Sequence, residues 1–418
     1  AYNRYARAYF DKRQYPRSLK KLNDAYAIAP ANIDTLNNLG FFYKKVPDAY
    51  YNDELKDNLK KMYYSKAPPA VERINSKFDV AIDFYLKAKT VNPKNITALV
   101  GIGDVYFLQG QYLKAREYYE SILKVDPDSV AGYSGLMNLF IERDDLPDLL
   151  TVYVELREKD LLSDVPLPLL GKLSEYFLTK TADGDKNVRI EHGISSERVK
   201  DEKDNLFPAV RTVLAAMHKT NADYPPLYLH YAKFALAQKN LVQMKGYLEQ
   251  AIEHADGQGE KYFGAEAMLG EYYYKTKDPA KAYEYFKKSL SSALSPAAFT
   301  QEEFYAETES TGRVKGMMGN VFYYNFDKIT SRFGDSADEA ELEEEAPDKE
   351  ADRMVNYEIA MKKYEDAVKD GFESSELHYN LGRIYYLKGL YDNAVSQWLN
   401  LYEDFTTSPE LIFALGNA

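Results

Sequence analysis

The sequence predicts an all-α fold, a solenoid of about nine helical hairpins stacked in chain order. Apolar residues recur at three-to-four spacing through most of the 418 residues, and a pattern of small and aromatic residues returns at intervals near 34. The third observation is a bias toward tyrosine, with 38 Tyr against 20 Phe and one Trp. A core position that repeats along the chain explains such a bias.

Composition narrows the class of function. The chain is 45% hydrophobic and 28% charged, an ordinary soluble balance, and its net charge of −12 argues against nucleic-acid binding. No apolar stretch approaches the length of a membrane-spanning helix, so we expect no membrane insertion. The absence of cysteine excludes disulfides and Cys-based metal sites. It fits the cytoplasm and a bacterial periplasm equally well.

The clearest unit covers residues 95–127, two amphipathic segments separated by a turn at Gly110–Gln111. Gly103 and Ala115 are small where the two helices must cross closely. Pro127 ends the second helix, because proline lacks a backbone donor and its ring clashes with the preceding turn. The two apolar stripes consist of Leu99, Ile102 and Tyr106, and of Tyr112, Tyr119 and Ile122.

This unit resembles the tetratricopeptide repeat (TPR), a 34-residue helix–turn–helix with small, aromatic and proline residues at fixed positions. Gly103 corresponds to repeat position eight. The resemblance implies a right-handed superhelical solenoid of TPR-like hairpins, although Met137, Ala232 and the Gly171 unit depart from the signature. Equivalent positions fall at Ala6, Gly40, Met137, Gly171, Ala232, Gly270, Gly319, Gly382 and Gly416. Position eleven holds Tyr9, Tyr43, Tyr106, Tyr273 and Tyr385, for which we expect core packing.

Three hairpins, the second, fifth and eighth, are expanded by long insertions between their helices. The interval from Gly40 to Gly103 is 63 residues, 29 more than one repeat, and the interval from Gly319 to Gly382 is the same. The insertions are residues 47–75, 180–205 and 326–352. Their spacing indicates either a duplicated three-repeat unit or chance placement, since loops tolerate insertion well.

The insertions differ in chemistry. Residues 47–75 are amphipathic and aromatic enough to form an extra helix, whereas residues 180–205 are charged and predict a loop. Residues 335–352 carry ten acids against one lysine and predict a solvated, disordered segment. A docking strip for a basic partner is the alternative for that acidic segment, and a calcium site lacks the expected ligand spacing. A further spacer, residues 297–311, precedes the eighth hairpin.

The repeats group into three regions. N-terminal repeats occupy residues 1–163, central degenerate repeats residues 164–296, and C-terminal repeats residues 297–418. Both ends of the sequence fall inside a repeat, and the last repeat is cut short, so we expect a fragment of a longer array.

The search for catalytic chemistry finds no candidate residues. Five histidines occur, none paired at metal-ligand spacing, and no nucleophile elbow or phosphate-binding glycine loop is present. We expect no enzyme activity, no metal site and no cofactor.

The family resemblance implies a partner-binding concave face at repeat positions two, five, nine, twelve and thirteen of the first helices. Aromatic and polar groups there suit a peptide, although packing alone also explains the aromatics. The first three repeats lack the Lys and Asn pattern with which some family members clamp a carboxylate. The candidate residues are Phe41, Phe107, Asn138, Lys233, Glu271, Tyr274, Asn320, Tyr323, Tyr379, Arg383 and Tyr386.

The sequence therefore predicts a scaffold or adaptor for other proteins or peptides. Two alternatives stay open: a structural subunit of a large bacterial envelope or flagellar-motor assembly, and the accessory region of an enzyme or solute-uptake system. The oligomeric state is not predicted.

Overall fold

The computed structural model describes residues 1–51, 76–182, 205–293, 301–324, 349–402 and 415. These residues are helical apart from turns and short connections, which confirms the predicted all-α fold. They form two compact units, Ala1–Ala222 and Asp223–Ala418. The three-region division expected from the sequence remains a prediction.

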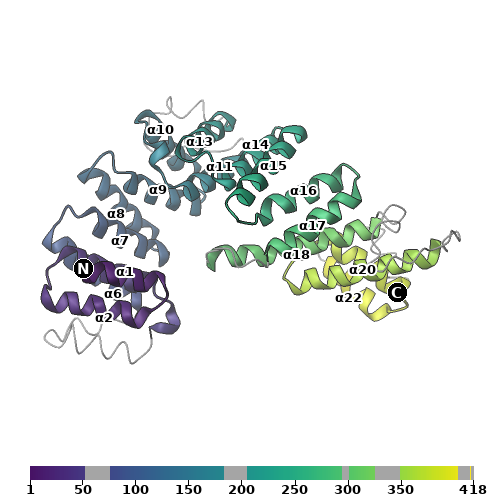
Figure 1. The fold of residues 1–418 in the computed structure, drawn as a ribbon, viewed down its shortest axis with the longest axis horizontal. Helices are drawn as coiled ribbons and strands as arrows, with labels where there is room; N and C mark the ends of the chain where they lie inside the picture. Colours follow the sequence, from purple (N-terminus) through teal and green to yellow (C-terminus); the bar gives the residue numbers. More distant parts are fainter. Residues whose placement is uncertain (52–75, 183–204, 294–300, 325–348, 403–414, 416–418) are drawn as a thin grey trace. The chain divides into compact units, whose positions relative to one another are not determined.

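Unit 1 contains five helical hairpins (Figure 1). Two short 3₁₀ helices, Asp48–Tyr50 and Leu162–Asp164, lie in its connections. In chain order its α-helices are α1 (Tyr2–Asp11), α2 (Tyr15–Ile28), α3 (Ile33–Lys45), α6 (Lys77–Val91), α7 (Ile96–Leu108), α8 (Tyr112–Val125), α9 (Val130–Glu142), α10 (Leu146–Glu158), α11 (Leu167–Ala182) and α13 (Phe207–Thr220).

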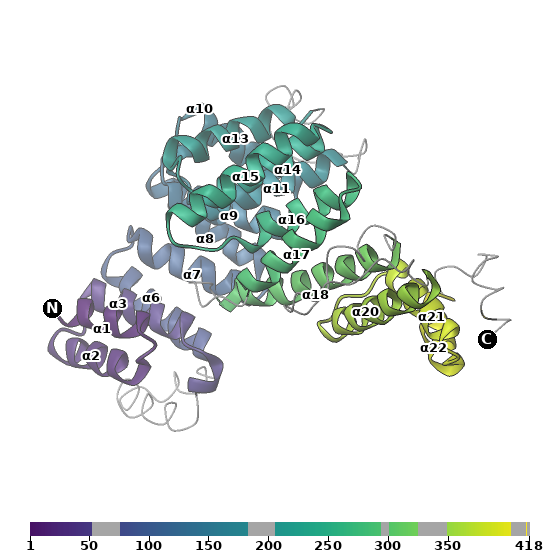
Figure 2. The same ribbon diagram turned by 45° about the vertical axis from the view of Figure 1, so that its right-hand side comes forward.

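Unit 2 contains four more hairpins, and Figure 2 shows α18 and α20 running side by side in one of them. Its helices are α14 (Pro225–Ala237), α15 (Leu241–Gly257), α16 (Phe263–Lys275), α17 (Pro279–Ala293), α18 (Gln301–Tyr324), α20 (Lys349–Lys369), α21 (Ser375–Leu387) and α22 (Tyr391–Tyr402).

Within the described residues the number of complete hairpins, nine, agrees with the prediction. The expanded ones are the second (α3 and α6), the fifth (α11 and α13) and the eighth (α18 and α20), also as predicted.

Local sequence sets the helix starts. Asn32 and Asn95 accept the backbone N–H three residues on, and Ser76 forms a capping box with Asp79.

In five of the hairpins, a glycine at repeat position eight lies against an aromatic ring at position twenty-four. A Cβ added to Gly103 would lie 2.7 Å from Cε1 of Tyr119, so only glycine admits that ring. Where position eight is alanine, as at Ala6 and Ala232, the residue at position twenty-four is leucine, which is smaller than an aromatic residue. The nine position-twenty-four residues are all buried: Leu22, Tyr85, Tyr119, Tyr153, Leu214, Leu248, Phe286, Tyr364 and Trp398.

Some of these rings also contact the next hairpin. Tyr85 lies against Gly40 of its own hairpin and against Gly101 of the following one, and Tyr119 lies against Gly103 and Gly135 in the same way. A single aromatic side chain thus fills the space between two first helices. The neighbour-to-neighbour packing expected of a solenoid is built from these contacts.

The six unexpanded hairpins share one turn geometry. In each, the residue seven positions after position eight has a positive φ, between 56° and 75°. Only two of the six are glycine; the others are charged residues, which adopt this conformation at a cost. The six residues are Arg13, Gly110, Asp144, Lys239, Lys277 and Gly389.

The expansions lie largely outside the described residues, so the predicted extra helix in residues 47–75 and the predicted loop character of 180–205 and 335–352 mostly stay predictions. Two corrections are visible. Helix α18 begins at Gln301, so most of the expected spacer 297–311 belongs to the first helix of the eighth hairpin. Helix α20 begins at Lys349, so the acidic segment does not run to residue 352 as a loop.

The position-eleven tyrosines do not all behave as core residues. Tyr43 and Tyr385 are buried, whereas Tyr9, Tyr106 and Tyr273 are half-buried. The stack of Tyr273 on Tyr285, with ring centroids 5.4 Å apart, shows how a half-buried ring still packs between helices.

Candidate functional site

The candidate partner-binding residues all lie on first helices. Unit 1 carries Phe41 on α3, Phe107 on α7 and Asn138 on α9. Unit 2 carries Lys233 on α14, Glu271 and Tyr274 on α16, Asn320 and Tyr323 on α18, and Tyr379, Arg383 and Tyr386 on α21. Most are half-buried; Asn320 is buried and Arg383 is exposed.

In unit 1 the candidates do not gather. Phe41 packs edge-on against Phe10, and the guanidinium of Arg7 lies 3.8 Å from the Phe41 ring centroid. Phe107 packs against Tyr112, the first residue of its own second helix, with ring centroids 5.8 Å apart. These contacts fit the packing role that the sequence left open.

Charged groups on the first helices of unit 1 pair within the protein. Lys44 Nζ lies 2.6 Å from Asp104 Oδ2, and the Tyr119 hydroxyl donates to Asp104 Oδ1 at 2.9 Å. Burial, reinforced by the Asp104 charge, raises the pKa of Tyr119 well above its usual range. This network joins consecutive hairpins.

In unit 2 the candidates converge on three neighbouring first helices. Asn320 Nδ2 donates to Glu376 Oε2 at 3.1 Å and accepts from the Tyr364 hydroxyl at 2.7 Å. Asn380 Nδ2 donates to the Tyr324 hydroxyl at 3.1 Å. This hydrogen-bonded seam fixes α21 against α18 and sets the positions of the groups around it.

Aromatic and charged groups surround the seam. Tyr323 packs edge-on against Tyr324, with ring centroids 4.8 Å apart. Burial raises the pKa of Tyr274 to about 12, and the nearby charges of Glu376 and Tyr324 add to this shift. We define the α16–α18–α21 face as Tyr274, Asn320, Tyr323, Tyr324, Glu376, Tyr379 and Arg383.

Sequence reasoning missed two members of this face. Glu376 and Tyr324 fall at repeat positions two and thirteen, which belong to the positions expected to face a partner. Position alone could therefore have found both residues. What the sequence could not show is that they meet across two hairpins.

Three predicted residues lie apart from this face. Glu271 is paired with Arg313, at 2.9 Å. Tyr386 packs on Trp398 and Tyr391 toward the second helix, and Lys233 belongs to α14, two hairpins before α18.

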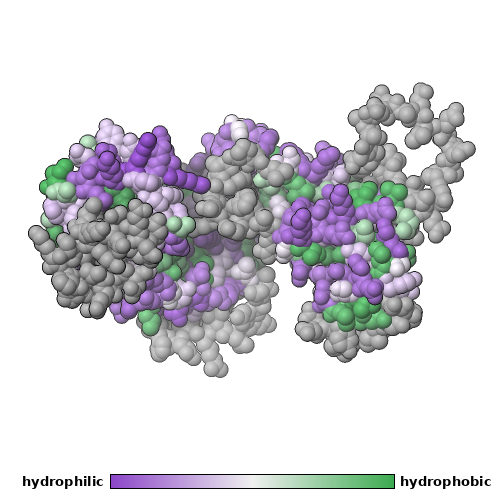
Figure 3. Space-filling model, turned by 90° about the horizontal axis from the view of Figure 1, so that it is seen from below, coloured by the Kyte–Doolittle hydropathy of each residue, from purple (hydrophilic) through white to green (hydrophobic). Residues whose placement is uncertain are grey.

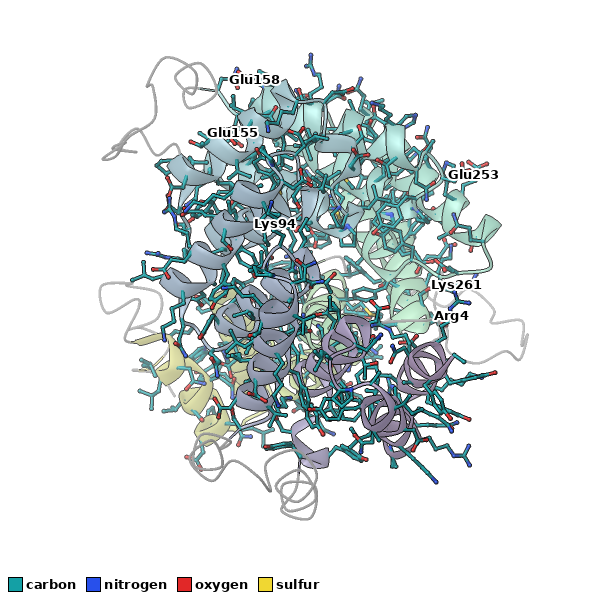
Figure 4. All side chains as sticks on the ribbon, turned by 90° about the vertical axis from the view of Figure 1, so that its left-hand side faces the viewer. Arg4, Lys94, Glu155, Glu158, Glu253 and Lys261 are labelled. Atoms are coloured by element: carbon teal, nitrogen blue, oxygen red, sulfur yellow. The ribbon has the colours of Figure 1, made fainter. Side chains whose placement is uncertain are left out.

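A separate cavity of about 390 Å³ lies in unit 1 where α8 ends and α9 begins. Glu155 and Glu158 on α10 line it and project outward (Figure 4), while Lys159 and Tyr133 both donate to the Pro127 carbonyl.

Among the described residues no group of three His, Asp or Glu side chains is arranged to hold a metal ion.

On the face in Figure 3, hydrophobic side chains (green) form small patches between hydrophilic ones (purple). None of the helices in the described ranges combines the length and apolar character that crossing a bilayer requires.

Comparison with known families agrees with this architecture. Tetratricopeptide-repeat models match residues 96–129, 267–295 and 349–409. These stretches contain the third hairpin, most of the seventh, and the last three helices of unit 2. These stretches are tetratricopeptide repeats, as the repeat pattern of the sequence predicts.

A TPR repeat-containing protein of Methanocaldococcus jannaschii is 23% identical over 408 residues, covering 94% of this chain. The match spans 62% of the length of that relative.

Among solved structures, a tetratricopeptide repeat protein from Parabacteroides merdae has 14% identity and a TM-score of 0.41, covering 73% of this chain and 95% of that one. PilF of Pseudomonas aeruginosa has 15% identity and a TM-score of 0.38, with 77% and 97% covered.

Proposed function

We propose that this chain is a non-catalytic scaffold that binds other proteins through its first helices, chiefly at the α16–α18–α21 face of unit 2. The observation that carries the proposal is the convergence of Tyr274, Tyr324, Glu376 and Arg383 on neighbouring first helices around an internally satisfied seam. Tyrosine and arginine are the residue types that dominate binding energy in protein interfaces. The family supports protein binding as the general role.

The aromatic side chains of this face are already held in place, which favours the binding of a partner. Tyr323 and Tyr324 pack against each other, and Asn380 donates a hydrogen bond to the Tyr324 hydroxyl, so ordering these rings costs little entropy when a partner docks. Tyr324 is nevertheless 52% exposed, which leaves contact area for a partner.

Affinity capture with a triple variant, Tyr274→Ala, Tyr324→Ala and Arg383→Ala, tests the proposal. The matched control replaces three exposed second-helix residues, Lys281, Glu284 and Lys287 on α17, by alanine. We expect the proteins captured by the wild type to be lost with the first variant and retained with the control. Equal capture by both variants, with helicity unchanged, rules out the α16–α18–α21 face as the binding surface.

A further inference from the structure

The first hairpin carries a positive charge that the rest of the chain does not share. Between residues 2 and 28, seven residues are Lys or Arg and two are Asp, so the hairpin has a formal charge of +5 in a chain whose net charge is −12. The third hairpin, residues 96–125, carries three basic and three acidic residues. The charge of the first hairpin is therefore a local feature and does not follow from overall composition.

Both acidic residues of the first hairpin are already paired with cations. Arg7 Nε lies 3.3 Å from Asp11 Oδ1, and Lys21 Nζ lies 3.6 Å from Asp24 Oδ2. The other five cations are exposed, and they form no ion pair with any residue in the described parts of the chain. These five are Arg4, Lys12, Arg13, Arg17 and Lys20.

Four of these cations are neighbours. Lys12 and Arg13 lie in the turn between α1 and α2. Arg17 and Lys20 are three residues apart on α2, and side chains at this spacing share one side of a helix. We define the α2 basic surface as Lys12, Arg13, Arg17 and Lys20. Because it lies on a turn and a second helix of unit 1, it is distinct from the first-helix face proposed above in unit 2.

The stability of the fold does not account for this cluster. Like charges on neighbouring positions repel one another, and a cation in the first turn of a helix, such as Arg17, opposes the helix dipole. Helix α2 has no acidic residue in its first turn and no side-chain cap that would offset this repulsion. Arg17 donates to the Gln14 side chain at 3.1 Å, which is a neutral acceptor. An anionic partner would supply the missing negative charge.

The extent of the surface favours an acidic protein segment over a nucleic acid. The four cations come from nine consecutive residues, and the chain outside the first hairpin has a formal charge of −17. A nucleic acid carries about one charge per 1.7 Å along a duplex, so a long one extends beyond so short a surface and is repelled by the remaining chain. A run of Asp and Glu can end where the cations end. Its carboxylates also accept paired hydrogen bonds from arginine.

We infer that the α2 basic surface binds a short acidic segment of a protein partner, whose Asp and Glu side chains pair with Arg13, Arg17 and Lys20. The inference goes beyond the function proposed above, because it concerns unit 1 alone and does not depend on the α16–α18–α21 face.

Fluorescent peptides test the inference without knowledge of the natural partner. The probe is a peptide of about twelve residues that alternates Glu and Ser, and the matched neutral probe alternates Gln and Ser. By fluorescence polarisation at low salt, we expect the acidic peptide to bind at least about tenfold more tightly than the neutral one. The difference should shrink at physiological salt, where charges more than about 8 Å apart are screened.

Charge reversal identifies the surface that binds. The triple variant Arg13→Glu, Arg17→Glu and Lys20→Glu should lose at least about tenfold in affinity for the acidic peptide. The matched control makes the same change in net charge and should keep the affinity of the wild type. It reverses three exposed lysines elsewhere in the chain, Lys94→Glu, Lys124→Glu and Lys287→Glu. Far-ultraviolet circular dichroism verifies that both variants keep their helices.

Three results would overturn the inference. No preference for the acidic peptide means that the surface does not bind carboxylates. Equal loss of affinity in the reversal variant and the control means that only net charge matters. Tighter binding of a single-stranded oligonucleotide, or of phosphatidylserine–phosphatidylcholine vesicles, through the same surface means that the class of partner is wrong. None of these results bears on the α16–α18–α21 face, which the triple alanine variant tests separately.

Discussion

At the scale of the residue, five hairpins show a size match between positions eight and twenty-four. Glycine lies against a ring at Gly40, Gly103, Gly270, Gly319 and Gly382. The sequence predicted a close crossing at Gly103 and Ala115, because a small residue at a fixed phase marks one. It did not reveal that a tyrosine occupies the gap, since that requires the distances between helices.

Gly103→Leu should destabilise the fold by about 1–3 kcal/mol, because the added side chain overlaps the Tyr119 ring. Gly246→Ala on α15 is the matched control, since a Cβ there meets nothing within 4 Å. The control should stabilise the protein by about 0.5–1 kcal/mol through lower backbone entropy in the unfolded chain. Urea unfolding measures both, and a neutral Gly103→Leu would contradict the register.

Glu266 is a buried carboxylate, 1% exposed, and its counter-charge is Lys288, with the two charged atoms 3.2 Å apart. Neither carboxylate oxygen has a hydrogen-bond partner among the described residues. Lys288→Met should therefore destabilise unit 2 by about 1–3 kcal/mol, because it leaves the charge buried and unpaired. Glu266→Met should be neutral or stabilising, and the reverse order in thermal unfolding would exclude this account.

At the scale of the element, the number of helices, the phase of the repeat and the three expanded hairpins were predictable from the sequence. The same residue pattern returns in each repeat, so each assignment can be checked against the others. The start of α18 was not predictable. Residues 301–311 have no repeat counterpart, so the sequence offered no phase by which to assign them to a helix. The site was predictable only in part: repeat positions select a face, whereas the convergence of Tyr324 and Glu376 depends on packing between hairpins.

Trp398 reports on the last hairpin alone. It is 2% exposed, and its indole Nε1 donates to the Tyr379 carbonyl at 3.2 Å. We expect blue-shifted emission that is poorly quenched by acrylamide in the folded protein. Emission like that of free tryptophan would show that α22 does not pack on α21.

The expansions provide a second element-scale prediction. In a stack of parallel hairpins, turns between first and second helices lie on one edge, so we propose that each of the three insertions provides a further docking surface at that edge of its own unit. Replacing each by the Gln109–Gln111 turn, with glycine at the positive-φ position, tests this. Loss of partner capture with helicity intact supports docking; unchanged capture with all three replaced shows that the edge plays no part.

At the scale of the whole molecule, alkaline pH should act through the buried tyrosines. Burial raises the pKa of Tyr385 to about 12, with Glu365 contributing, and burial is also the largest cause of the raised pKa values of Tyr85, Tyr119 and Tyr364. A raised folded pKa means that this stability is complete below the unfolded value near 10 and is lost above it. Urea midpoints should therefore fall from about pH 10 to pH 12, with tyrosinate absorbance rising as the chain unfolds. A constant midpoint over that range would contradict the burial of these phenols.

The rings shared between hairpins determine where the chain can be divided. The Tyr85 ring packs against a glycine of the second hairpin and a glycine of the third, and the Tyr119 ring likewise joins the third hairpin to the fourth. A fragment that ends after the second or the third hairpin keeps the ring but loses the glycine on the other side. It therefore exposes a large aromatic surface to water. The second, third and fourth hairpins are therefore the smallest block of this region that can be excised with both rings enclosed.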